Sequence, residues 1–106
     1  METNGKDVRR SREFDSWLRK LRDPVGKSAI LFRLQRIQHS GHFGDVKFVG
    51  QGVFELRIST GKGYRIYYIE LRRQYVYLLV GGSKASQRRD IRLAFDLAKQ
   101  ALNEFP

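Results

Sequence analysis

Hydrophobic residues in the first forty positions recur with the period of an α-helix. The spacing i, i+3, i+4 and i+7 is occupied by Phe14, Trp17, Leu18 and Leu21. This pattern predicts a helix that Ser11 caps and that ends near Arg22. Asp23 suits the N-cap and Pro24 the first position of a second helix, which we expect to run to about Gln38. Together the two segments predict a helical hairpin.

From Val46 onward the hydrophobic period changes to two, which is typical of β-strands. The segment 46–48 predicts a short strand, and the turn-forming residues 50–52 follow it. Longer alternating segments, with glycine-rich or polar turns between them, lie at 54–58, 64–71 and 75–80. We therefore expect a meander of three antiparallel strands, which Gly81-Gly82 closes.

Two further elements lie near the ends of the chain. Residues 7–10 predict a weak edge strand, and apolar residues from Ile91 to Leu102 predict a last helix that Ser83 or Ser86 caps. The order of elements predicts an α+β fold, with the helices on one face of a compact antiparallel sheet. We treat residues 1–106 as one domain in which residues 1–6 are flexible.

Charge and composition narrow the choice of partners. The chain has 21 Lys and Arg against 11 Asp and Glu, a net charge of +10 that is spread over its whole length. This excess favours a polyanion or an acidic protein as partner, or it is a solvated surface. With no Cys and two His, we expect no metal and no cofactor. No apolar run approaches the ~20 residues of a membrane span, so we expect a cytoplasmic protein without membrane contact.

The most informative feature is the hairpin centred on Gly61. If this hairpin is symmetric, Arg57 lies opposite Arg65, and Tyr67 shares their face. Like charges opposite each other are destabilising unless an anion lies between them. The pair therefore predicts a phosphate-binding face. The alternative is that both arginines extend into water and pair with Glu55.

Four other basic residues are weaker candidates. Lys47 and Lys84 flank the predicted sheet, although a lone lysine is more often a solvated surface group. Arg88 and Arg89 lie at the start of the last helix, where they would contact phosphate or form a solvated helix face. The sequence does not decide between these alternatives.

Several motifs together resemble the RelE/ParE toxin superfamily and, within it, the HigB-like, Gp49-type addiction-module killer proteins. The resemblance runs from about residue 8 to residue 98, in colinear order. Its main segments are Gly44-Asp45-Val46-Lys47, Glu55-Leu56-Arg57-Ile58, Gly63-Tyr64-Arg65-Ile66-Tyr67-Tyr68 and Leu78-Leu79-Val80-Gly81-Gly82-Ser83-Lys84. Ser83 stands where many members of this branch have Asp.

The resemblance implies a RelE-like fold and the toxin role in a type II toxin–antitoxin pair. It implies a metal-independent endoribonuclease that cleaves mRNA, on the ribosome or free, and a helix-turn-helix, HigA-like antitoxin. The basic residues that match the family's catalytic positions are Arg57, Arg65, Lys84 and Lys47. For substrate binding we expect Tyr64, Tyr67, Arg88 and Arg89. The alternatives are a ParE-like inhibitor of DNA gyrase and a nucleic-acid binder without activity.

Overall fold

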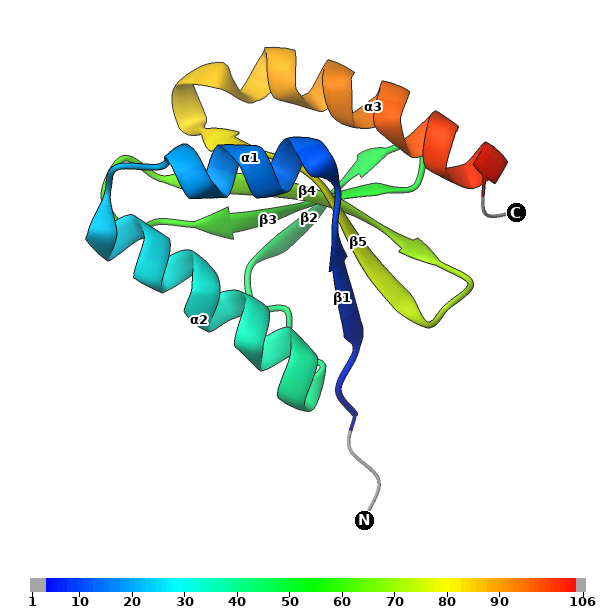
Figure 1. Cartoon of the computed structure of the whole chain (residues 1–106), viewed down its shortest axis with the longest axis horizontal. Helices are drawn as coiled ribbons and strands as arrows, with labels where there is room; N and C mark the ends of the chain where they lie inside the picture. Colours follow the sequence, from blue (N-terminus) through cyan, green and yellow to red (C-terminus); the bar gives the residue numbers. More distant parts are fainter. Residues whose placement is uncertain (1–3, 105–106) are drawn as a thin grey trace.

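A computed structural model describes residues 4–104 and contains one sheet with three α-helices (Figure 1). The elements in chain order are β1 (Asp7–Arg10), α1 (Arg12–Lys20), α2 (Pro24–Ser40), β2 (Val46–Gly50), β3 (Val53–Ile58), β4 (Tyr64–Leu71), β5 (Tyr75–Ser83), the 3-10 turn η1 (Lys84–Ser86) and α3 (Gln87–Glu104). The α+β class is confirmed. Of the residues expected to be flexible, 1–3 lie outside the described part of the chain. The backbone N–H of Lys6, by contrast, donates to the carbonyl oxygen of Ile37 at 3.0 Å.

The sheet has five strands in the order β1-β5-β4-β3-β2 and is mixed. Strands β2 to β5 form an antiparallel meander of four strands, one more than we predicted. Strand β1 pairs in parallel with β5, from Asp7 opposite Tyr75 to Arg10 opposite Leu78. The prediction of a purely antiparallel sheet is therefore wrong. Parallel pairing requires a long connection, and here the two helices and the rest of the meander supply it.

Local capping signals place both N-terminal helices where the sequence predicted them. The hydroxyl oxygen of Ser11 accepts from the backbone N–H of Phe14 at 2.9 Å, and this hydroxyl donates to the carbonyl of Leu79 at 2.6 Å. At the start of α2, the Asp23 carboxylate accepts from the N–H of Gly26 at 3.0 Å. These caps satisfy N–H groups that have no partner within the helices.

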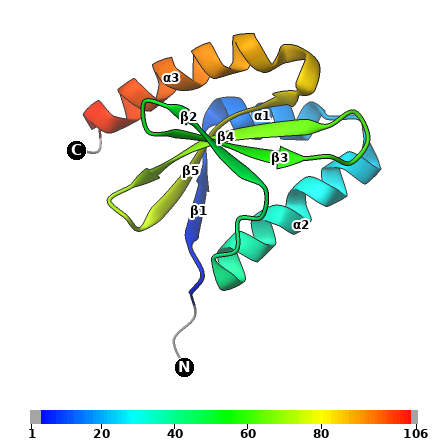
Figure 2. The same cartoon turned by 180° about the vertical axis from the view of Figure 1, so that it is seen from behind.

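The helices cover both faces of the sheet, which corrects the prediction of helices on one face. Figures 1 and 2 show the sheet between α2 and α3. The face toward α1 and α2 buries apolar side chains of β3 and β4 such as Leu56 and Ile66, and the face toward α3 buries Tyr67 and Ile69. Strand β4 is apolar on both sides because both sides are covered, and such strands do not alternate with polar residues.

Strand β5 continues through Gly81 and Gly82 to Ser83, although we predicted that these glycines end it. A Cβ atom on Gly81 would meet the indole of Trp17 in α1, and a Cβ on Gly82 would meet the carboxylate of Asp90 in α3. The two glycines therefore let a helix approach the strand closely on each face. The Ser83 hydroxyl makes no cap contact, and Ser86 instead donates to Asp90 at 2.5 Å.

Candidate active site

Arg57 and Arg65 lie opposite each other on β3 and β4, as the hairpin symmetry predicted. Directly opposed residues of an antiparallel pair share a face, with Cβ atoms about 4.5–5.5 Å apart. The face is the one that α3 covers further along the sheet, and both side chains are partly exposed. The structure thus places two partly exposed arginines opposite each other on this face.

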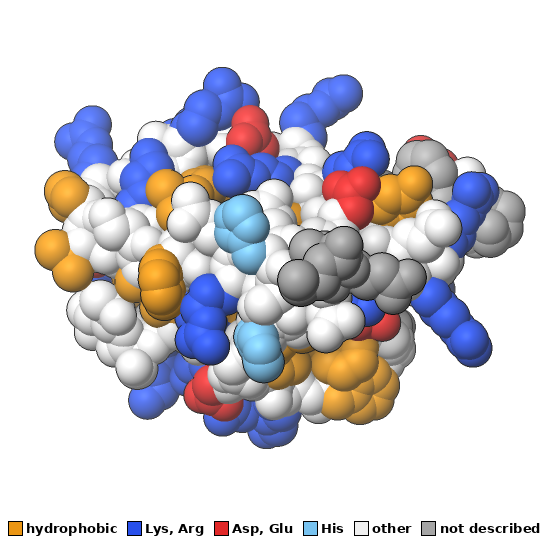
Figure 3. Space-filling model, turned by 90° about the horizontal axis from the view of Figure 1, so that it is seen from below, with side chains coloured by type: hydrophobic (Ala, Val, Ile, Leu, Met, Phe, Trp, Pro, Cys, Tyr) orange, Lys and Arg blue, Asp and Glu red, His pale blue; other side chains and the backbone are white. Residues whose placement is uncertain are grey.

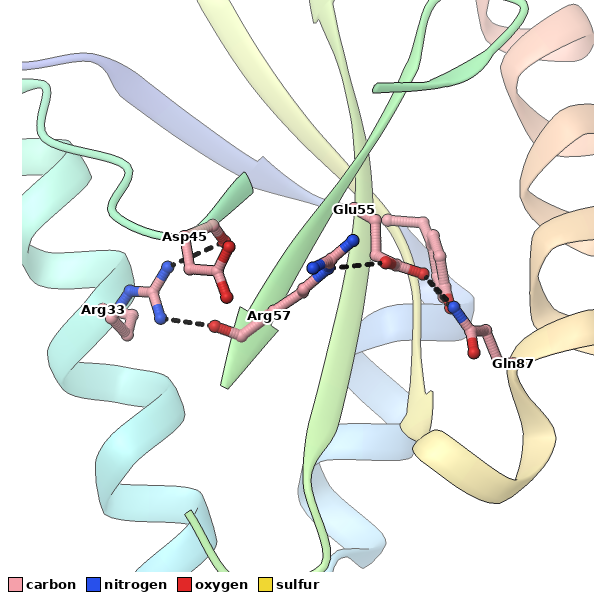
Figure 4. Close-up of polar contacts among 6 residues, drawn as sticks. Arg33, Asp45, Glu55, Arg57 and Gln87 are labelled. Carbon is pink, nitrogen blue, oxygen red and sulfur yellow. Dashed lines mark hydrogen bonds and ion pairs between the residues drawn. The ribbon is translucent and has the colours of Figure 1, made fainter. Parts of the chain in front are cut away.

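The side chain of Glu55, on the same face, is 1% exposed and accepts three hydrogen bonds (Figure 4). The donors are Nε of Arg57 at 3.1 Å, the hydroxyl of Tyr67 at 3.1 Å and Nε2 of Gln87 at 2.7 Å. Burial raises the pKa of this carboxyl, but the three donors and the charge of Arg65 outweigh it and hold the pKa below the ordinary value. Glu55 is therefore ionised and holds the side chains of Arg57, Tyr67 and Gln87 in place.

The arginine pair keeps unused capacity to bind an anion. Arg57 uses its Nε for Glu55, and its side chain is 33% exposed. The Nε of Arg65 is buried and has no hydrogen-bond partner within residues 4–104. The two arginines carry two positive charges against the single negative charge of Glu55. This excess of positive charge is complementary to a phosphate.

Arg33 of α2 fixes the backbone on which Arg57 is carried. Its guanidinium donates to the carbonyl oxygens of Arg57 at 2.6 Å and Asp45 at 3.3 Å (Figure 4). It also donates to the carbonyl oxygen of Phe43 at 2.6 Å. Burial is the main cause that lowers the pKa of Arg33. These contacts tie the end of β3 and the segment before β2 to α2.

Lys47 and Lys84 lie on two sides of the arginine pair. Lys47 of β2 is exposed and lies opposite Glu55, so it shares the face of the site. Lys84 is exposed at the end of β5, where its backbone N–H donates to the carbonyl of Gly63 at 3.0 Å. The fold thus gathers basic residues from three parts of the chain around one stretch of sheet.

The two tyrosines expected to bind substrate are instead buried in the core. Tyr64 lies on the opposite face, where its hydroxyl donates to Asp23 at 2.6 Å and its ring meets Trp17 edge-on. Tyr67 is fully buried beneath Glu55. Burial and the adjacent carboxylate of Glu55 raise the pKa of Tyr67. Neither ring is accessible for stacking on a base, so we do not retain either residue as a substrate contact.

Arg88 and Arg89 are exposed on the first turn of α3 and, with Arg92, line an open hollow. The Nε of Arg89 is 3.8 Å from the buried carboxylate of Asp90. Since Gln87 of the same turn reaches Glu55, the helical turn that carries these arginines adjoins the site. In Figure 3, Lys and Arg side chains also surround the underside of the molecule, so the positive charge is not confined to the site.

Comparison with known proteins places the chain in a family. A family model described as Phage derived protein Gp49-like (DUF891) matches residues 16–103. The chain belongs to the Gp49-like family. This family is of the RelE toxin type. An uncharacterized protein of Haemophilus influenzae is 47% identical over 87 residues, which cover 82% of this chain and 87% of the relative. No solved structure matches significantly.

Two residues of the site in this Gp49-like protein are visible only once the chain is folded. Glu55 shares the face of Arg57 by strand alternation, but the sequence shows it only as a possible partner of the arginines. Gln87 lies 32 positions further along the chain, and no sequence signal links it to Glu55. Their contact depends on how α3 lies against the sheet.

The described residues of this family member contain neither a metal-binding cluster nor a membrane-spanning helix. Between residues 4 and 104, no group of three or more His, Cys, Asp or Glu side chains is placed to hold a metal ion. None of the helices in the same range is long and apolar enough to cross a membrane.

Proposed function

We propose that this chain is the toxin of a type II toxin–antitoxin module and inhibits translation by cleaving mRNA as a metal-independent endoribonuclease. Membership of the Gp49-like family supports a toxin-like role. The observation that carries the cleavage proposal is the opposed pair Arg57–Arg65 on a partly exposed stretch of the sheet, in which the ionised carboxylate of Glu55 holds Arg57. Two opposed arginines can bind a phosphate through paired, charge-assisted hydrogen bonds.

The chemistry of RNA cleavage suits this arrangement. The 2′ oxygen attacks the adjacent phosphorus, the bond to the 5′ oxygen breaks, and negative charge develops on the non-bridging oxygens. Arg57 and Arg65 would bind these oxygens and stabilise the added charge, because charge-assisted hydrogen bonds strengthen as the charge develops. Glu55 accepts from Nε of Arg57 and so holds the other nitrogens of that fork toward the phosphate.

Proton transfer requires groups on both sides of the phosphate. We assign it to Lys47 and Lys84, which lie on two sides of the arginine pair. One, as the neutral amine, would take the proton of the 2′ hydroxyl, and the other, as the ammonium, would give a proton to the leaving 5′ oxygen. Arg88 and Arg89, on the helical turn that adjoins the site, would contact neighbouring phosphates of the RNA.

The proposed partners follow from the same role. The Gp49-like family is associated with toxin–antitoxin systems, which supports a cognate antitoxin, and we expect a helix-turn-helix, HigA-like protein. The net charge of +10 suits mRNA and the ribosome as further partners.

Induced expression in cells that lack the antitoxin tests the proposal. Wild-type chain should stop growth and create new mRNA 5′ ends within minutes, while Arg65→Ala and Arg57→Ala should do neither. Arg36→Ala is the matched control, because Arg36 is an exposed arginine on α2, across the sheet from the site. Equal cleavage by Arg65→Ala and wild type would exclude the proposed chemistry.

The same experiment separates the alternatives. Growth arrest without new mRNA ends, together with loss of supercoiling by purified DNA gyrase, would replace the nuclease with a ParE-like inhibitor. Growth that is unaffected by the wild-type chain, with RNA still bound in vitro, would leave a nucleic-acid binder without activity.

A further inference from the structure

A second basic groove lies on the same face of the sheet, at the end remote from the arginine pair. It has a volume of about 450 Å³ and is lined by Arg9, Arg10, Leu71, Arg72, Tyr75 and Tyr77. Leu71 and Arg65 are six residues apart on β4, which corresponds to about 20 Å along the strand. Helix α3 packs on the part of this face that lies between them, through Ala94 and Ala98. The groove is therefore separate from the proposed reaction site.

The groove contains a guanidinium group that is already held against an aromatic ring. The central carbon of the Arg9 guanidinium lies 5.0 Å from the ring centroid of Tyr75. The same guanidinium donates to both carboxylate oxygens of Asp7, at 2.8 and 3.0 Å. Ring and carboxylate together fix a planar cation in one orientation. Such a cation beside the partly exposed rings of Tyr75 and Tyr77 is a platform on which nucleobases stack.

Cations for phosphate groups lie beside this platform. Arg10 is only loosely paired, with its Nη1 3.6 Å from Asp15, and both side chains are about 40% exposed. Arg72, in the turn between β4 and β5, is exposed and has no ion-pair partner within the described residues. Beyond Tyr77, by contrast, lie Glu13 and Glu104. Burial is the main cause that raises the pKa of the Tyr77 hydroxyl, and the charges of these two carboxylates raise it further. These carboxylates line a neighbouring hollow, and the charged residues that line the groove itself are all arginines.

We propose that this groove binds single-stranded RNA, with a base stacked at Tyr75 and Tyr77 and phosphates at Arg10 and Arg72. The choice of RNA as ligand rests on the proposed function. An acidic peptide would match the arginines but would leave the two tyrosine rings without a role. The groove would hold a stretch of RNA outside the cleaved bond, and so would contribute to substrate affinity and not to the chemical step.

Direct binding measurements with two kinds of variant test the groove. The probe is a fluorescently labelled, unstructured 12-nucleotide RNA, followed by anisotropy at several salt concentrations, in the Arg65→Ala background so that the RNA stays intact. Tyr75→Leu keeps the apolar contacts of the side chain and should weaken binding at least about fivefold, the lower end for loss of one base stack. Arg10→Gln with Arg72→Gln should lower the slope of log affinity against log salt by about 1.4, for two phosphate contacts on a single strand.

The matched control is the double variant Arg22→Gln with Arg36→Gln, which removes two exposed arginines outside the groove. Urea unfolding midpoints near that of the parent establish that each variant is folded. Equal losses of affinity and slope in the control and in the groove variants would overturn the proposal, because binding would then be diffuse. Unchanged RNA affinity with lost binding of a poly-glutamate peptide would also overturn it.

Cleavage kinetics in the otherwise wild-type chain separate the two proposals. The groove variants should raise KM for long RNA by the factor measured in binding and leave kcat unchanged. Absence of cleavage by the wild-type chain would overturn the proposed function, while the binding comparison would still decide about the groove. Normal cleavage together with unaltered affinity of the groove variants would overturn the groove alone.

Discussion

Replacing Glu55 by glutamine tests how the site is held together. The Glu55 side chain is 1% exposed and accepts from Arg57, Tyr67 and Gln87, which come from two strands and a helix. Glutamine has nearly the same shape, but it carries no charge and offers one acceptor oxygen in place of two. At least one donor, and the charges of two arginines, are then left without compensation.

The expected loss of stability follows from these contacts. A hydrogen bond to a charged group contributes about 1.5–3 kcal/mol, and breaking a buried ion pair costs about 3–5 kcal/mol. Arg57 is 33% exposed, so water screens part of its charge. We therefore expect Glu55→Gln to lower the free energy of unfolding by about 3 kcal/mol, which lowers Tm by on the order of 15 °C in a chain of this size.

Urea unfolding followed by circular dichroism measures this loss, with Glu70→Gln as the matched control. Glu70 is an exposed glutamate on β4, and its substitution should change the free energy of unfolding by less than about 0.5 kcal/mol. Equal unfolding midpoints for Glu55→Gln and wild type at pH 7 would refute the role of Glu55 as an anchor.

The pH dependence provides a second check on the same residue. In the folded chain the pKa of Glu55 lies below its ordinary value of 4.5. Its stabilisation is therefore complete at neutral pH and is lost as the pH falls through the folded pKa. The stability gap between wild type and Glu55→Gln should narrow below pH 4.5. A gap that stays constant down to pH 3 would show that the carboxylate charge is not the cause.

Three further predictions concern the scaffold. Tyr64→Phe should raise the pKa of Asp23 toward its ordinary value of 3.8, because the Tyr64 hydroxyl is the main contact that lowers it; an NMR titration in which this pKa does not move would contradict the prediction. Gly82→Ala should lower the free energy of unfolding by about 1–3 kcal/mol, since a Cβ there meets the carboxylate of Asp90. The double variant Gly82→Ala with Asp90→Ala should recover part of the lost free energy of unfolding, measured by urea unfolding. No recovery would show that the contact between the new Cβ and Asp90 is not the cause of the loss. Arg33→Lys should accelerate amide hydrogen exchange in residues 41–47, because lysine cannot donate to three carbonyls in the geometry of arginine. Unchanged exchange would show that these hydrogen bonds of Arg33 are not needed to hold the segment.

Local signals in the sequence were sufficient for much of the scaffold. The caps of α1 and α2 were predicted because capping depends on residues within one turn of the helix end. The pairing of Arg57 with Arg65 was predicted because a short hairpin turn sets the register of the two strands that it joins.

The failures concern residues that are far apart in the chain. Neither the parallel pairing of β1 with β5 nor the position of α3 on the second face follows from periodicity, which reports only that an element has an apolar side. Tyr64 and Tyr67 were misassigned because aromatic residues in a strand have the same pattern whether they bind a ligand or fill a core.

Four features follow from the sequence alone, because each depends on neighbouring residues or on composition. They are the succession of elements, the helix starts, the arginine pair and the positive charge. Which surface stays open, by contrast, follows only from the packed fold, since it depends on where α3 lies on the sheet. The same packing buries Glu55 beside Gln87, a contact across 32 positions, and thereby turns a strand glutamate into the anchor of Arg57. Burial and long-range contact are properties of the assembled layers, and no local pattern encodes them.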